Sequence, residues 1–227
     1  PTTIFLTSQI APSILGVTAV IAYVYMALVP FIQPPLVKLF TTKRERAIVM
    51  KAPRDVGRTE KIILPLLAML LIILIVPRSA PLISMFMIGN IFKESGVVPR
   101  LADAASNEIL NVATVFLMLT IGTQLSADSV FQLATIKILI LGVVAFAIST
   151  VSGVLFAKLM NLVLREKINP LIGAAGVSAV PMAARIAHQV AQEENPNNYL
   201  LPHAMAPNVA GVIGSAVIAG VFLALLN

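Results

Sequence analysis

Long apolar segments alternate with short polar ones along the whole chain. The apolar segments are residues 11–37, 62–76, 82–92, 109–121, 138–157, 168–184 and 199–226. Residues 138–157 form an uncharged stretch of twenty residues, the length that a helix needs to cross about 30 Å of hydrocarbon. Within 11–37, prolines at 30, 34 and 35 predict interruptions. The pattern predicts an all-α, polytopic membrane protein.

The apolar segments are of two kinds. Residues 62–76 and 138–157 are mainly aliphatic and suit contact with lipid, whereas 168–184 and 199–226 are rich in Gly, Ala, Pro and Asn. Small side chains let helix backbones approach one another closely. We therefore expect the last two segments to lie inside the helix bundle.

Composition supports the membrane assignment and excludes other classes. Of 227 residues, 58% are hydrophobic and only 11% are charged, whereas a soluble domain carries about 25% charged residues. This balance excludes an ordinary cytosolic globular protein, a disordered tail and a nucleic-acid binder. Because the chain has no cysteine, disulfides, thiolate metal sites, cysteine nucleophiles and iron–sulfur clusters are excluded too.

The positive charge is concentrated in one segment, residues 42–61. Its basic residues are Lys43, Arg44, Arg46, Lys51, Arg54, Arg58 and Lys61, and its acidic ones are Glu45, Asp55 and Glu60. A short basic loop between apolar segments is typical of the cytoplasmic side. An amphipathic helix lying on anionic lipid is compatible with the same placement.

The sequence contains a candidate internal repeat. Residues 1–11 and 181–191 both read Pro, seven residues, and then Gln-(Ile/Val)-Ala. Inverted repeats with Pro- and Gly-broken helices are typical of transporters that bind their substrate near the membrane midplane. We therefore divide the chain into 1–41, the half-helix and following span that end a first repeat; 42–61, the basic cytoplasmic loop; and 62–227, a second repeat. The second repeat contains a discontinuous helix at 168–191 and a core helix at 199–226.

This division conflicts with a simple count of crossings. If every apolar segment crosses the membrane, five lie between the two Pro-led segments, which then have the same orientation, whereas an inverted repeat needs opposite ones. Either residues 82–92 or 109–121 are re-entrant or only half-spanning, or a further crossing lies near residues 34–50. The sequence leaves the number and direction of the spans open.

The segment from Asn169 to Arg185 carries the densest chemistry. Pro181 lacks a backbone N–H, so residues 177–181 are expected to leave the helix, and Gly173 permits a close approach. Carbonyl groups freed at membrane depth need protein, water or an ion as partner. With the side-chain oxygens of Asn169 and Ser178 they could bind Na⁺. A Pro-kinked packing helix is the alternative.

Further candidates lie outside that segment. Asn208, in the last apolar segment, either faces Ser178 or the ion, or bonds to a neighbouring helix. Arg185 either snorkels to an interface or binds a carboxylate, and the phenol of Tyr25 either relays a proton or marks an interface. His188 and His203 lack metal-ligand spacing, so we interpret them as interfacial or structural.

Two motifs carry a resemblance to a known family. They are NPLIGAAGVSAVPMAAR at 169–185 and HAMAPNVAGVIGS at 203–215, supported by YMALVPFIQPP at 25–35 and GNIFKESGV at 89–97. The chain closely resembles, over essentially its whole length, the β subunit of sodium-pumping biotin-dependent decarboxylases, which act on oxaloacetate, methylmalonyl-CoA or glutaconyl-CoA. The resemblance implies a Na⁺/H⁺ antiporter-like fold in the inner membrane of a prokaryote.

The resemblance also implies roles for particular residues. It implies that Asn169, Gly173, Ser178 and Asn208 line the Na⁺ path, with Tyr25 and Arg185 acting nearby. The implied reaction is decarboxylation of carboxybiotin, a substrate carried by a partner and not bound covalently by this chain, coupled to Na⁺ export. The implied partners are a biotin carrier or carboxyltransferase subunit, a small membrane γ-type subunit and further copies of the chain. The acyl substrate belongs to another subunit.

The family pattern also includes an aspartate in an Asp-Gly-Pro-Thr motif. Pro1 and Thr2 match its last two positions, so we expect an Asp-Gly pair directly before Pro1. A start without Met agrees with the expectation that this is the C-terminal portion of a longer protein, inactive on its own. The alternative function is a stand-alone Na⁺/H⁺ antiporter or Na⁺-coupled anion symporter.

Overall fold

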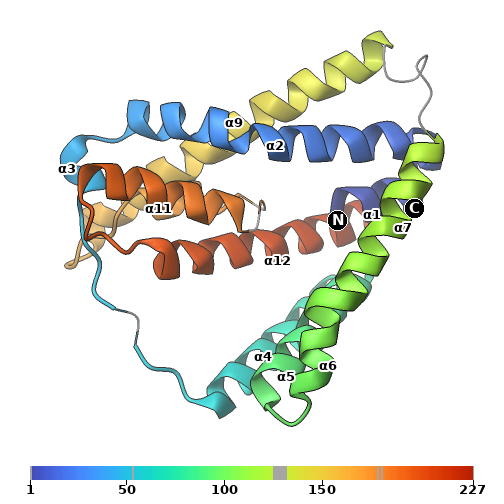
Figure 1. The fold of residues 1–227 in the computed structure, drawn as a ribbon, viewed down its shortest axis with the longest axis horizontal. Coiled ribbons are helices and arrows are strands. Elements are labelled where there is room, and N and C mark those ends of the chain that lie inside the picture. The colour runs from blue at the N-terminus through green and yellow to red at the C-terminus, as the bar shows by residue number, and fades with distance from the viewer. Residues whose placement is uncertain (1, 53, 125–131, 178, 180, 227) are drawn as a thin grey trace. The chain divides into compact units, whose positions relative to one another are not determined.

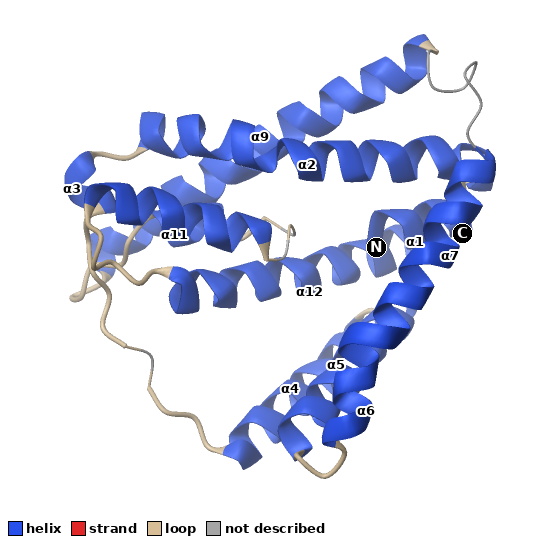
Figure 2. Ribbon diagram, in the orientation of Figure 1, coloured by secondary structure: helices blue, strands red, loops and turns tan. Residues whose placement is uncertain are grey.

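A computed structural model describes residues 2–52, 54–124, 132–177, 179 and 181–226. Every regular element in this described part is helical (Figures 1 and 2). Among the described residues, four helices are long and apolar enough to cross a membrane: Pro12–Phe40, Pro99–Thr123, Thr135–Val163 and Leu201–Leu226. The predicted all-α, polytopic membrane protein is confirmed.

The chain forms two compact units. Unit 1 contains Pro1–Val20, Arg54–Gln132 and Ser215–Asn227, and unit 2 contains Ile21–Pro53 and Leu133–Gly214. Two helices of equal length, α2 (Leu15–Phe40) and α12 (Leu201–Leu226), contribute residues to both units. These spatial units do not test the proposed division into repeats, which stays a prediction.

Unit 1 is built around a helical hairpin. Its elements are α1 (Thr2–Ile10), the short 3₁₀ turns η1 (Pro12–Ile14) and η2 (Pro77–Ser79), α4 (Arg58–Ile75), α5 (Ala80–Ser95), α6 (Pro99–Ala104), the π-helical η3 (Ala105–Ile109) and α7 (Leu110–Gln124). Helices α4 and α5 pack against each other. Arg58 donates from Nε to the carbonyl of Glu94 at the end of α5 (2.8 Å), and left-handed Gly96 then ends that helix. Neither α4 nor α5 is among the four candidate spans.

Unit 2 holds the first part of the basic segment, residues 42–53, and the motif at 169–185. Besides most of α2 and the first half of α12, it contains α3 (Lys43–Arg46), α9 (Leu133–Val163), α10 (Leu171–Ala174) and α11 (Met182–Glu194). The Ala-rich face of α11 is buried, whereas many aliphatic side chains of α4 and α9 are exposed. The expectation that the small-residue segments lie inside the bundle is confirmed for 168–184 but is only partly correct for 199–226, where Ile218, Phe222 and Leu225 are exposed.

One local prediction is wrong. Helix α2 runs without a break through Pro30, Pro34 and Pro35, because each proline removes one helical hydrogen bond while the rest of a 26-residue apolar helix remains intact. The basic segment 42–61, whose assignment as a cytoplasmic loop stays a prediction, contains helical residues. It begins with the capped turn α3, where Thr42 and Glu45 form a capping box, and from Arg58 onward it belongs to α4.

Candidate functional site: a re-entrant hairpin with buried amides at its tip

Helices α10 and α11 are the two arms of one interrupted segment. Helix α10 ends after Ala174, and α11 begins at Met182, directly after Pro181. The described residues between them are not helical, because Pro181 has no N–H to donate and glycines at 173 and 176 lower the helix propensity. The predicted break is therefore present, and it begins two residues earlier than expected.

Both ends of this segment are tied to Arg46. At its start, Asn169 donates from Nδ2 to the carbonyls of Arg46 (2.8 Å) and Ile48 (3.0 Å). At its end, Glu194 accepts two hydrogen bonds from the Arg46 guanidinium (2.6 and 3.0 Å). Figure 1 shows α11, in orange, returning toward α3. The segment is thus a re-entrant hairpin that enters and leaves at one end of unit 2.

A second asparagine strengthens this junction. Asn198, just before α12, donates to the same carbonyls of Arg46 (3.3 Å) and Ile48 (3.0 Å) as Asn169 does. We call the surrounding region, residues 38–48, 158–169 and 193–198, the polar end of unit 2. Its ion pairs are Lys38–Glu193, Arg46–Glu194 and Lys158–Glu45.

Hydrogen bonds at the polar end lower the pKa of two carboxyl groups. The hydrogen bond from Arg46 lowers the pKa of Glu194, and the charges of Lys43 and Lys38 act in the same direction. Partial burial raises the pKa of Glu45, but hydrogen bonds from Thr42 and Lys158 outweigh it, so that pKa is lowered as well. Both carboxylates are therefore held in the charged form that their ion pairs need.

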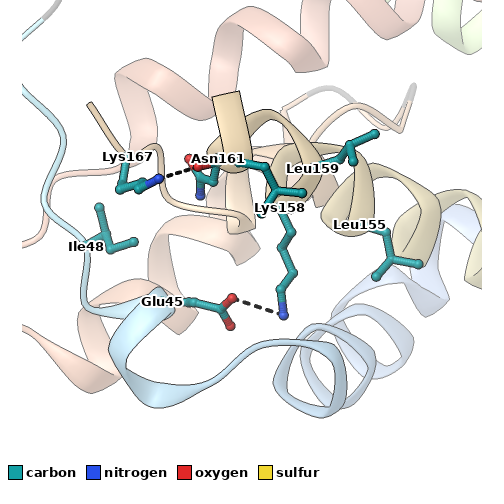
Figure 3. A pocket seen from close by; sticks show the side chains of 8 residues that line it. Glu45, Ile48, Leu155, Lys158, Leu159, Asn161 and Lys167 are labelled. Atoms are coloured by element: carbon teal, nitrogen blue, oxygen red, sulfur yellow. Dashed lines mark hydrogen bonds and ion pairs between the residues drawn. The ribbon is translucent and has the colours of Figure 1, made fainter. Parts of the chain in front are cut away.

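The polar end also contains an open groove of about 520 Å³ (Figure 3). Apolar side chains of α9 line it together with Glu45, Lys158, Asn161 and Lys167. Its polar groups bind one another: Lys158 pairs with Glu45 (3.0 Å), and Lys167 donates to the carbonyl of Asn161. Because these groups already have partners, the groove is not the candidate ion site.

Two glycines bring α10 against α9. A Cβ added at Gly173 would collide with the carbonyl of Gly153, and a Cβ at Gly153 would collide with the carbonyl of Gly173. The two backbones are therefore in direct contact, a distance that excludes any side chain at either position. Gly173 thus has a packing role whatever else it does.

Two buried side-chain amides hold the tip of the hairpin. Gln33 of α2 donates from Nε2 to the carbonyl of Ala174 (3.0 Å). Asn208 of α12 donates from Nδ2 to the carbonyls of Ala175 (2.8 Å) and Val177 (3.0 Å). Both side chains are fully buried. The hairpin tip therefore lies between one amide from each of the two long helices.

The oxygen atoms of both amides have no hydrogen-bond partner within the described part of the chain. Carbonyl groups only accept hydrogen bonds, so the nitrogens must face them and the oxygens are the atoms left over. A buried unpaired acceptor costs about 1–3 kcal/mol. Oxygen atoms are the ligands that hard cations prefer, so this region fits a cation.

The tip lies within the apolar part of the structure. Gln33 precedes the end of α2 at Phe40 by seven residues, and Asn208 follows the start of α12 at Leu201 by seven. At 1.5 Å per residue, both amides lie about 10 Å along their helices from the polar end.

The structure separates the residues that the sequence grouped together. Asn208 and Gly173 lie at or next to the tip, whereas Asn169 lies at the polar end, where its oxygen also accepts from the backbone N–H of Leu171 (3.1 Å). Ser178 lies outside the described residues. Tyr25 is half-buried and its ring packs against that of Phe146 (centroids 6.0 Å apart). Arg185 is exposed on the first turn of α11.

The histidines and acidic residues do not form a metal centre in the described part of the chain, where no group of three or more His, Cys, Asp or Glu could hold an ion. The His188 ring packs against Tyr199 (centroids 5.7 Å apart). Its buried Nδ1 has no partner among the described residues. The unpaired buried oxygen atoms of the described part belong to the neutral amides of Gln33 and Asn208.

Four residues of this region were not singled out as site residues from the sequence: Gln33, Arg46, Gly153 and Asn198. Gln33 carried the clearest signal, a polar residue within the uncharged stretch 11–37. Gly153 interrupts an aliphatic segment, but a lone glycine there predicts no particular partner. Arg46 is one of seven basic residues in its segment, and nothing in the sequence distinguishes it as the buried one.

Comparison with known proteins identifies the family. Residues 1–226 match the family described as the Na⁺-transporting oxaloacetate decarboxylase beta subunit. Oxaloacetate decarboxylase beta chain 2 of Salmonella typhi is 55% identical over 98% of this chain and 52% of its own length. Methylmalonyl-CoA decarboxylase subunit beta of Veillonella parvula is 54% identical over 100% of this chain and 61% of its own length. The corresponding subunit of Propionigenium modestum is 55% identical over 100% of this chain and 58% of its own.

The chain thus spans between about half and three-fifths of the length of these relatives. Over that span the resemblance carried by residues 169–185 and 203–215 is confirmed. The chain belongs to the family of Na⁺-transporting oxaloacetate decarboxylase beta subunits.

Proposed function

We propose that the chain provides the ion-binding part of a membrane subunit that couples decarboxylation of carboxybiotin to Na⁺ export. Family membership supports this function, and the four apolar helices fit an inner-membrane, multi-pass protein. In this proposal Na⁺ is the transported substrate, and a biotin carrier or carboxyltransferase subunit delivers carboxybiotin. A small γ-type membrane subunit and further copies of the chain complete the complex.

The main support for the proposal is the hairpin tip, whose carbonyl groups accept hydrogen bonds from the buried amides of Gln33 and Asn208. Unwound backbone and neutral oxygen atoms at membrane depth are features of secondary-transporter ion sites. Asn208 is the best-placed of the predicted ligands, because its amide contacts the tip and its oxygen has no other partner in the described part. We propose Ser178 as a further ligand from the sequence, and Asn169 and Gly173 as the residues that position the hairpin.

The basic character of the polar end supports its placement on the cytoplasmic side. Carboxybiotin would then approach from the end at which the hairpin enters the membrane. Coupling requires that decarboxylation is fast only in the ion-loaded conformation, so that the difference in Na⁺ affinity between two conformations drives export. The hairpin links the side from which carboxybiotin approaches to the ion site, because its ends lie at the polar end and its tip lies at the amides.

Two side chains are proposed to act on the carboxylate and the proton. The guanidinium of Arg185 is exposed and can pair with a carboxylate. The hydroxyl of Tyr25 lies in the helix that also provides Gln33, and it can pass a proton toward biotin when CO₂ leaves. Both roles require that carboxybiotin reaches Arg185 and Tyr25.

A co-purification experiment tests the proposed function. The full-length protein should be retained on avidin through a biotinylated partner, and the complex should release CO₂ faster when Na⁺ is added. A stand-alone Na⁺/H⁺ antiporter or Na⁺-coupled anion symporter would show neither property. Retention without any effect of Na⁺ on CO₂ release would also contradict the proposal.

A substitution tests the role of Tyr25. Tyr25→Phe keeps the ring packing on Phe146 but removes the hydroxyl. Na⁺-dependent decarboxylation should fall by at least about tenfold, because a general acid–base group contributes about 10²–10⁴-fold and water can replace part of that contribution. Tyr23→Phe, two residues earlier in the same helix, is the matched control and should leave the rate unchanged. An unchanged rate for Tyr25→Phe would exclude the relay.

A further inference from the structure

Gln33 differs from the other candidates for the ion site, because neither the sequence pattern nor the family resemblance assigned it a role. It lies in α2 between Pro30 and Pro34 and is fully buried. Its Nε2 donates to the carbonyl of Ala174 (3.0 Å), which fixes the orientation of the amide. Its Oε1 is then a buried acceptor with no partner in the described part of the chain.

Asn208 repeats this arrangement from another helix. Its Nδ2 binds two carbonyls of the same tip, and its Oδ1 is likewise buried and unpaired within the described residues. The two amides come from α2 and α12 and lie at the same depth of about 10 Å along their helices. Ala174 and Ala175, which they contact, are adjacent in sequence.

The tip residues that Gln33 and Asn208 contact have neutral side chains and present backbone carbonyl acceptors. The set formed by Gln33, residues 174–177 and Asn208 consists of neutral side chains only. Pro34 has no N–H, so the carbonyl of Pro30 also lacks its helical donor beside Gln33. A site of neutral oxygen atoms can coordinate a monovalent hard cation, whereas a divalent cation generally needs carboxylate ligands.

We infer that Oε1 of Gln33 is a ligand of the transported Na⁺, bound together with Oδ1 of Asn208 at the tip of the hairpin. This inference rests on the proposed function and extends it by naming the α2 ligand. It also gives α2 a defined role, since an ion bound by Gln33 and Asn208 links both long helices to the hairpin. Ion binding and release would then change how the tip is held.

The test uses two substitutions of Gln33 with opposite expected effects, in the full-length protein within its complex. Gln33→Leu removes the oxygen and should raise the Na⁺ concentration for half-maximal decarboxylation by roughly tenfold, the effect of one lost interaction of ordinary strength. Gln33→Glu keeps an oxygen and adds a negative charge. It should lower that concentration at neutral pH and make it rise as the pH falls, because protons then compete with Na⁺.

Direct binding of ²²Na⁺ to the purified complex, measured without turnover, should be weaker for Gln33→Leu than for the wild type. At neutral pH it should be tighter for Gln33→Glu than for the wild type. Gln189, an exposed residue of α11, provides the matched controls: Gln189→Leu and Gln189→Glu should leave both measurements unchanged. If Gln33 only supports the fold, or if water occupies the tip, both Gln33 variants will lower the amount of active complex and leave the Na⁺ dependence as in the wild type. That outcome would overturn the inference.

The wild-type complex separates this inference from the proposed function. If the wild type shows no Na⁺-dependent decarboxylation, the proposed function is wrong. If the wild type depends on Na⁺ and both Gln33 variants respond to Na⁺ as the wild type does, only the assignment of Gln33 is wrong.

Discussion

Asn169 and Asn198 donate hydrogen bonds to the same two carbonyls, those of Arg46 and Ile48. The sequence and the family resemblance pointed to Asn169 as part of the Na⁺ path, and nothing pointed to Asn198. Because the two amides make equivalent contacts, substitutions can separate a positioning role from an ion-binding role at position 169. If Asn169 only positions the backbone, the loss of stability on its substitution overlaps with the loss on substitution of Asn198. If Asn169 binds the ion, its substitution has an effect that substitution of Asn198 does not have.

We predict that Asn169→Leu and Asn198→Leu each destabilise the full-length protein by about 1–3 kcal/mol, since each leaves two buried carbonyls with one donor fewer. Their effects should not add in the double variant, because both act on the same carbonyls. Thermal unfolding in detergent measures this, with Asn197→Leu, an exposed neighbour, as the control. Additive effects, or a changed Na⁺ dependence for position 169 alone, would favour a ligand at Asn169.

The structural role of a residue could be predicted from the sequence where it depends on the residue itself or its neighbours in the chain. It could not be predicted where it depends on a distant partner. Pro181 predicts the break, because the missing N–H is a property of the residue itself. The buried state of Arg46 is not local, since it results from Glu194, which lies 148 residues later in the chain. The role of Gln33 likewise depends on its hydrogen bond to Ala174, which lies 141 residues away in the chain. Sequence reasoning therefore found the tip but missed one of the two amides that hold it.

At the scale of elements, the contact between α9 and α10 depends on two glycines. The sequence indicated that Gly173 permits a close approach but did not identify the partner, Gly153, in the aliphatic helix α9. Any side chain at either position would push the two backbones apart. Because α10 leads directly into the tip, such a shift would also displace the carbonyls that Gln33 and Asn208 contact.

We predict that Gly153→Ala and Gly173→Ala each destabilise the protein by about 1–3 kcal/mol, the usual effect of overpacking. Gly142→Ala in the same helix α9 is the matched control, because nothing lies within 4 Å of a Cβ added there. It should be neutral or slightly stabilising, by up to about 1 kcal/mol, since Ala is the better helix former. Equal unfolding temperatures for Gly142→Ala and Gly153→Ala would disprove the direct backbone contact.

At the scale of the whole molecule, ionic contacts of the polar end connect segments distant in sequence, and this makes stability depend on pH. Arg46 is buried, with 7% of its side chain exposed, and Glu194 is its carboxylate partner. The hydrogen bond from Arg46 lowers the pKa of Glu194 in the folded protein below its ordinary value of about 4.3. The stabilisation is therefore complete above that ordinary value and is lost as the pH falls through the lowered one.

We predict that the wild-type full-length protein keeps a constant unfolding temperature from neutral pH down to about 4.3 and loses stability below it. Glu194→Gln should be less stable at neutral pH, because Arg46 then lacks a charged partner, and its stability should fall less steeply in acid. Glu193→Gln is the control, since its pair with Lys38 is about half exposed and adds little. If Glu194→Gln and the wild type lose stability in parallel below that pH, acid acts on other groups and the Arg46–Glu194 pair does not hold the ends of the hairpin together.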